Sequence, residues 1–245
     1  MPHRAITALA LAGLFTFGAG PLLAQEFSVS LGEGGSLSGR SVQLILLITV
    51  LSIAPGLAVM VTCFPFLVTV FSILRQAIGL QQSPPNMLLV SLAMFLTYFI
   101  MEPVFMQAWT EGIEPLTREE LTMTEAFPKV ADPFRHFMIG RVDPETFASI
   151  ASLRPEMASL SPSADAPLSV IIPSFMLSEV ARAFQVGFLI FVPFLIIDLV
   201  VAAILMSMGM MMVPPAVVAL PFKLSFFVLA DGWRLLTEGL VRSYF

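Results

Sequence analysis

The sequence predicts an all-α membrane protein with about four long hydrophobic helices arranged in hairpins. Hydrophobic residues occupy 57% of the 245 positions and charged residues only 12%, and the mean hydropathy is +0.91. A soluble domain of this length could not bury so much apolar surface. The net charge of -5, with Lys and Arg scattered singly, argues against nucleic acid as a partner. The chain is therefore expected in or against a membrane.

The N-terminal residues 1–24 have the pattern of a cleavable signal peptide. Arg4 precedes an apolar stretch, and Leu22-Leu23-Ala24 comes before a polar pair. Because Leu22 is larger than the residue usually found three positions before a cut, an uncleaved anchor stays the alternative. Residues 25–43, rich in Gly and Ser, are interpreted as a flexible extracytoplasmic leader.

Residues 44–74 contain no charged side chain. As one straight helix they would measure roughly 46 Å, against a hydrocarbon core of roughly 30 Å. Either Pro55-Gly56 or Pro65 breaks this segment into two elements, or it is a bent helix that continues beyond the bilayer and packs on protein. We favour the bent helix.

A loop over residues 81–86 separates this segment from a second apolar helix that restarts at Met87 and is interrupted near its far end by Glu102-Pro103. Residues 44–109 thus predict a first helical hairpin.

Residues 110–170 have the composition of a solvated insert. Asp132-Pro133 and Asp143-Pro144 each place a helix N-cap before a first-turn proline, and residues 117–120 resemble a capping box, so short helices are expected. If the signal peptide puts the mature N-terminus outside, two crossings place this hydrophilic insert outside the membrane as well.

Residues 171–245 predict a second helical hairpin, with a methionine-rich connection between two apolar segments. Gly209 and Pro214-Pro215 are typical of a turn between helices. Methionine is flexible and polarizable, so such a cluster can form an apolar seal that adapts to what touches it, or can fill an irregular gap in a core. The sequence leaves these two alternatives open. The methionines of this connection are Met206, Met208, Met210, Met211 and Met212.

Asp198 and Lys223 stand out as charges inside the apolar segments of this second hairpin. Each lies eight residues from the connection, which puts both roughly 12 Å from the turn and lets them pair. An ionised group in apolar surroundings marks a partner, a water path or a subunit interface. By contrast, Glu179 with Arg182 is interpreted as a simple surface pair at helical spacing.

The sequence offers no catalytic arrangement. Its two histidines, His3 and His136, and its one cysteine, Cys63, cannot form a metal set or a nucleophile triad within one chain. A nucleotide-binding P-loop is also lacking. We therefore predict no enzyme activity, no metal and no cofactor.

Four stretches carry a family resemblance: SILRQAIGLQQSPPN (72–86), FLTYFIMEPV (95–104), SEVARAFQVGF (178–188) and the segment 190–233 around the methionines. In these stretches the chain resembles the FliP family of flagellar biosynthetic proteins. The resemblance covers about residues 44–109 and 171–245. It departs at Pro65-Phe66 and at Ala181, where many members have Thr-Arg and Lys.

The resemblance implies a core subunit of the flagellar type III protein export gate in the bacterial inner (cell) membrane, at the flagellar basal body. Several copies, a pentamer in the family, would assemble with FliQ and FliR into a helical pore for unfolded flagellar proteins. FlhA and FlhB would lie nearby. Met208, Met210, Met211 and Met212 would line the constriction as a gasket, and Asp198 and Lys223 would support assembly. From the residues alone, a small-solute or proton transporter and a passive membrane scaffold stay as alternatives.

Overall fold

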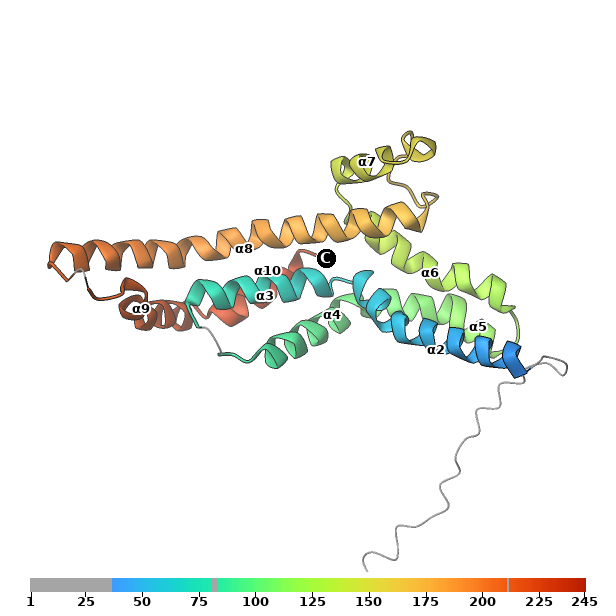
Figure 1. Cartoon of the computed structure of the whole chain (residues 1–245), viewed down its shortest axis with the longest axis horizontal. Coiled ribbons are helices and arrows are strands. Elements are labelled where there is room, and N and C mark those ends of the chain that lie inside the picture. Colours follow the sequence, from blue (N-terminus) through green and yellow to red (C-terminus); the bar gives the residue numbers. More distant parts are fainter. Residues whose placement is uncertain (1–36, 81–82, 211) are drawn as a thin grey trace, which may run out of the picture. The chain divides into compact units, whose positions relative to one another are not determined.

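The computed structural model describes residues 37–80, 83–210 and 212–245, and the regular structure in these ranges is helical (Figure 1). The predicted signal peptide, most of the leader and Met211 lie outside the described residues. Residues 1–50 and 51–245 form two separate units. Of the first unit, only the beginning of helix α2 is described.

The charge-free segment forms two helices, α2 (Leu37–Met60) and α3 (Phe64–Ile78), rather than the single bent helix we favoured. Pro65 stands in the first turn of α3, where its missing amide hydrogen costs nothing, whereas inside a continuous helix it would remove a hydrogen bond. The Thr62 hydroxyl oxygen accepts the Phe64 amide hydrogen at 3.4 Å. The break between the helices therefore falls at residues 61–63.

Helix α4 (Asn86–Ala108) continues straight through Glu102-Pro103, so this dipeptide does not interrupt it. A π-helical turn (Trp109–Ile113) and the short helix α5 (Glu114–Thr117) follow without a break. The apolar helix and the start of the hydrophilic insert thus form one continuous helical segment, Asn86–Thr117.

The insert contains helices α6 (Met123–Ile139) and α7 (Pro144–Ser152) and a 3₁₀ turn (Pro155–Met157). The predicted N-cap at Asp143 is confirmed, because its carboxylate accepts the Thr146 amide hydrogen at 2.8 Å.

Two other helix starts predicted in the insert are wrong. Pro133 lies inside α6, and the capping box is formed by Thr122 and Glu125 instead of residues 117–120. Both wrongly predicted sites have residue types that suit a helix start. Thr122, however, comes directly before α6, whereas Asp132 lies inside α6 and Thr117 is the last residue of α5.

The C-terminal part consists of α8 (Leu168–Ser207), α9 (Pro215–Leu229) and α10 (Gly232–Arg242). Helix α8 has 40 residues and is therefore roughly 60 Å long, twice the roughly 30 Å of a hydrocarbon core. It lies along α3 (Figure 1). A Cβ atom on Gly187 would come within 2.4 Å of the Ile73 Cδ1 atom, so the two helices approach closely at this glycine.

The two larger apolar cores in the described part of residues 51–245 join helices that are distant in the sequence. One lies between α3, α4, α8 and α10, and the other joins α6 and α7 of the insert to the first turns of α8. The first contains Phe66, Val70, Phe71, Leu89, Ala93, Ala183 and Leu240. The second contains Met138, Phe147, Ala151, Val170, Ile171 and Phe175.

Helix length and composition agree with a membrane protein. Within the described chain, two helical stretches are long and apolar enough to cross a bilayer, Asn86–Thr117 and Leu168–Ser207. The number rises to four if α2 with α3 and α9 with α10 each count as one bent span. The predicted all-α membrane fold is confirmed.

Candidate functional site

The end of α8, where the turn to α9 begins, is closed by defined hydrogen bonds. The Met210 amide donates to the Leu205 carbonyl at 2.9 Å, and the Gly209 amide donates to the Met206 carbonyl at 3.1 Å. These are the two hydrogen bonds of a Schellman cap, which needs a residue with positive φ just after the helix. Gly209 supplies it with φ of 73°. Pro215 then starts α9 in its first turn.

The methionines of this turn are exposed. The exposed fraction is 66% for Met208, 41% for Met210 and 98% for Met212, and Met211 lies outside the described residues. Apolar side chains gathered at the tip of a hairpin do not fill a core of this chain. The core-filling alternative therefore fails for these three residues within a single copy.

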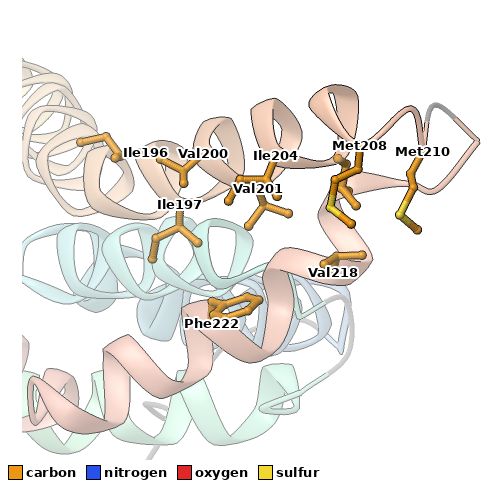
Figure 2. Close-up of a pocket in the computed structure, with 10 residues that line it drawn as sticks. Ile196, Ile197, Val200, Val201, Ile204, Met208, Met210, Val218 and Phe222 are labelled. Atoms are coloured by element: carbon orange, nitrogen blue, oxygen red, sulfur yellow. The ribbon is translucent and has the colours of Figure 1, made fainter.

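Below the tip, α8 and α9 enclose an apolar groove with a volume of about 520 Å³. Figure 2 shows Ile197, Val201 and Ile204 on α8 facing Val218 and Phe222 on α9, with Met208 and Met210 at the right-hand end, beside the turn. The groove is continuous with the exposed methionines. The hairpin thus presents one uninterrupted apolar surface.

Asp198 and Lys223 meet within one chain. The Lys223 Nζ atom lies 2.6 Å from the Asp198 Oδ2 atom and also donates to the Ala77 carbonyl at 3.0 Å. Ala77 is in the last turn of α3, where a cation is favourable because the helix dipole leaves partial negative charge there. Buried Lys223 thereby links three helices, α3, α8 and α9.

The Asp198 carboxylate is only half satisfied by this arrangement. Its Oδ1 atom is shielded from solvent and has no hydrogen-bond partner among the described residues. The side chain as a whole keeps 32% of its surface exposed. The pair therefore holds the hairpin through one carboxylate oxygen and leaves the other, shielded oxygen without a donor among the described residues.

A second charged cluster was missed in the sequence. Glu179 is completely buried, so its interpretation as part of a surface pair with Arg182 is wrong. Its Oε1 atom accepts hydrogen bonds from Arg141 at 3.0 Å and from Arg182 at 3.2 Å, and its Oε2 atom accepts one from the Tyr244 hydroxyl. Arg141 comes from the insert and Tyr244 from beyond α10, so no local spacing could have revealed this cluster.

Further contacts make this cluster a junction between the insert, α8 and the chain after α10. The Arg141 guanidinium stacks over the Tyr244 ring at 4.0 Å and donates to the Ser243 carbonyl at 2.8 Å. The Asp143 amide donates to the Ser178 hydroxyl at 2.9 Å. The insert is therefore attached to α8 by hydrogen bonds as well as by its apolar core.

The pKa values of two side chains at this junction are shifted. Burial, reinforced by the Glu179 charge, raises the pKa of the Tyr244 hydroxyl, which stays protonated as a donor. Hydrogen bonds from the Thr146 amide and hydroxyl lower the pKa of Asp143. Both shifts favour the protonation states that the hydrogen bonds require.

A family model described as the FliP family matches residues 47–240, which include the hairpin, the groove, the Asp198–Lys223 pair and, of the second cluster, Arg141, Glu179 and Arg182. This chain belongs to the FliP family. The predicted family is thereby confirmed. In this FliP-family chain, no group of three or more His, Cys, Asp or Glu side chains within the described ranges could hold a metal ion.

Curated relatives of this FliP-family chain carry the name flagellar biosynthetic protein FliP. The protein from Caulobacter vibrioides is 50% identical over 217 residues, covering 89% of this chain and 81% of the relative. The Aquifex aeolicus protein is 43% identical over 245 residues, 99% of each chain. The Bacillus subtilis protein is 44% identical over 208 residues, 83% of this chain and 92% of the relative.

Proposed function

We propose that this FliP-family chain is a pore subunit of the flagellar protein export gate and that its methionine-rich turn is the gasket. The observation that carries the proposal is the exposure of Met208, Met210 and Met212 on a rigidly capped turn. Exposed apolar side chains at the tip of a hairpin need a covering surface. Tips of neighbouring copies, meeting around an axis, would supply it.

The chemistry of methionine suits a gate for unfolded protein chains. At rest, a ring of thioethers excludes water and so blocks ions, which a potential of 100 mV drives with roughly 2.3 kcal/mol per charge. During export, the same unbranched side chains adapt to many different passing side chains, which a ring of Leu or Val would do poorly. Met211, by its place in the sequence, would belong to this ring.

The same proposal specifies the partners of the protein and its location in the cell. Several copies, a pentamer by the family pattern, would assemble with FliQ and FliR in the bacterial inner membrane at the flagellar basal body, near FlhA and FlhB. Unfolded flagellar proteins would be the cargo. The proposed role is a conduit without catalysis, and the Asp198–Lys223 pair would hold each hairpin in shape for assembly.

The test is to replace Met208, Met210 and Met212 together with Ala and to measure ion conductance of the assembled complex. Conductance is expected to rise at least about tenfold at equal assembly, because smaller side chains leave a wetted gap. Growth should fall in parallel when the complex is expressed in cells. The same positions changed to Leu should stay ion-tight while exporting cargo more slowly.

A matched control changes three exposed methionines that lie away from the turn: Met94, Met106 and Met123. Their replacement by Ala removes the same atoms and should leave conductance unchanged. A triple turn variant that assembles normally and stays as ion-tight as the parent would refute the gasket.

A further inference from the structure

The methionines at the tip of the α8–α9 hairpin expose groups that can be oxidised. Met208, Met210 and Met212 are all exposed in a single copy. By contrast, Met101 and Met138 are buried in the two larger apolar cores. Small oxidants convert an accessible methionine thioether into a sulfoxide. The tip of the hairpin and the cores therefore differ in their susceptibility to oxidation.

The proposed gate keeps these thioethers accessible in the assembled complex. Neighbouring copies would cover the sides of each tip, but side chains that line the passage face its contents. A passage that lets an unfolded protein chain through also admits hydrogen peroxide, which is little larger than water. Assembly would therefore leave the exposed thioethers within reach of a small oxidant.

A sulfoxide would find no hydrogen-bond donor among the side chains of the apolar groove. Met208 and Met210 line this groove, and the other side chains that line it, from Ile196 on α8 to Phe222 on α9, are all apolar (Figure 2). Oxidation replaces an apolar thioether by a polar group whose oxygen accepts hydrogen bonds. The apolar lining cannot satisfy that oxygen.

The polar hydrogens at the end of α8 are already in use. The Met208 amide donates to the Ile204 carbonyl at 3.1 Å, and the Ser207 hydroxyl donates to the same carbonyl at 2.7 Å. The amides of Gly209, Met210 and Val213 also donate to carbonyls of this segment. A polar oxygen left without a donor in apolar surroundings is unfavourable. A sulfoxide formed here would therefore draw in water.

We propose that Met208, Met210 and Met212 form an oxidation site for small two-electron oxidants of the peroxide class, and that sulfoxide formation there opens the seal to water and ions. The peroxide O–O bond breaks, an S–O bond forms at the thioether, and the second oxygen leaves as water with both hydrogens. The sulfur loses two electrons, which the peroxide gains. The inference rests on the proposed function, because only a seal can be opened in this way.

The change is chemically reversible. Methionine sulfoxide reductases, one for each epimer of the sulfoxide, restore the thioether. The S–O bond breaks, the oxygen leaves as water, and two thiols that supply the electrons become a disulfide. The restored apolar side chains would exclude water again, so the seal would close.

The test treats the complex, co-purified with FliQ and FliR in mild detergent, with hydrogen peroxide. Mass spectrometry of peptides measures sulfoxide at each methionine, and ion conductance is recorded after reconstitution into lipid bilayers. Sulfoxide at the turn should form at least about tenfold faster than at buried Met101 and Met138. Conductance should rise at least about tenfold in parallel. Treatment with the two reductases and a dithiol should reverse both changes.

Two variants separate the turn from the other exposed methionines. In the turn variant, four methionines are changed together to Leu, which is apolar and cannot form a sulfoxide: Met208, Met210, Met211 and Met212. In the matched control, three exposed methionines away from the turn are changed to Leu: Met94, Met106 and Met123. The rise in conductance on peroxide treatment should be at least about fivefold smaller in the turn variant than in the parent, and undiminished in the control.

The outcomes separate this inference from the gasket itself. Turn sulfoxides that leave conductance unchanged, where Ala at the same positions causes a leak, overturn the inference and leave the gasket standing. Turn thioethers that resist peroxide while Met94, Met106 and Met123 are oxidised also overturn it. An equal rise in the parent and the turn variant assigns the leak to other residues and overturns the site. A complex that stays ion-tight with Ala at the turn refutes the gasket, and the inference falls with it.

Discussion

Helix α8 carries two carboxylates whose surroundings differ in an instructive way. Glu179 is completely buried, and three donors, from Arg141, Arg182 and Tyr244, satisfy both of its oxygen atoms. Asp198, 19 residues and roughly 28 Å further along the helix, is partly exposed, pairs with one cation and keeps one oxygen that has no partner among the described residues. Both are anions in largely apolar settings, yet within the described part of the chain only Glu179 has both oxygen atoms satisfied.

The two carboxylates therefore stabilise different parts of the molecule. A buried carboxylate with both oxygen atoms satisfied fixes local geometry, because its loss leaves its donors unpaired. A carboxylate satisfied at one oxygen can still hold its own hairpin together through that oxygen. The Glu179 cluster therefore secures the insert on α8, and Asp198 secures the hairpin that carries the methionines.

The largest effect is expected from Glu179→Ala. It leaves the largely buried Arg141 and the half-buried Arg182 without their shared anion, which should lower the free energy of unfolding by about 3 kcal/mol. Thermal or denaturant unfolding in detergent would measure the loss, and limited proteolysis should show earlier release of the insert.

Glu238→Ala provides the control for that change, because it removes an exposed ion pair with Arg242 at helical spacing. It should cost at most about 0.5 kcal/mol. Equal losses for the two variants would show that the Glu179 cluster is no more than a surface pair.

A smaller effect is expected at the hairpin. From the sequence alone, exchanging the charges of Asp198 and Lys223 should restore their ion pair, but the structure alters this expectation. Exchanging the charges, with Asp198→Lys and Lys223→Asp together, would restore an isolated ion pair. Here the exchange also sets a carboxylate against the Ala77 carbonyl at the negative end of α3. We expect the double variant to recover no more folded complex than either single change, measured as oligomer yield in size-exclusion chromatography.

Two single changes at the hairpin, Lys223→Met and Asp198→Asn, should lower the free energy of unfolding by different amounts. Lys223→Met leaves two acceptors without a donor, whereas Asp198→Asn keeps an acceptor for Lys223. The first should cost about 2–3 kcal/mol and the second about 1 kcal/mol. Recovery of parental yield by the charge exchange would show that the Ala77 contact is unimportant.

The smallest effect is expected at the edge of the insert, where Asp143 caps α7. Its folded pKa is lowered by the Thr146 hydrogen bonds, so its contribution is present above the pKa of the unfolded chain and is lost as pH falls through the folded value. Hydrogen exchange of the Thr146 amide should therefore speed up, relative to the intrinsic rate, on acidification below about pH 4.

Asp143→Asn removes the titrating group and keeps a capping oxygen. In this variant, amide protection at Thr146 should stay nearly constant over the same acidic range. A variant that loses protection with the same pH dependence as the parent would assign the titration to another group.

Local patterns in the sequence were enough for the features that depend on nearby residues. The apolar runs, the N-cap at Asp143 and the turn at Gly209 each depend on adjacent positions, and four stretches of sequence carried the family resemblance. The pairing of Asp198 with Lys223 also followed from counting residues on either side of one turn. Residues at equal distances from the tip of a helical hairpin lie beside each other.

Only the tertiary structure decided which charges are buried and what else they touch. Glu179 with Arg182 has the spacing of any exposed helical pair, and burial came from Arg141 and Tyr244, which approach from distant parts of the chain. In the same way, the contact of Lys223 with Ala77 depends on α3 packing beside the hairpin. Spacing along a helix determines which side chains share a face, but the elements that cover this face determine whether a charge there is solvated, satisfied or left open to a partner.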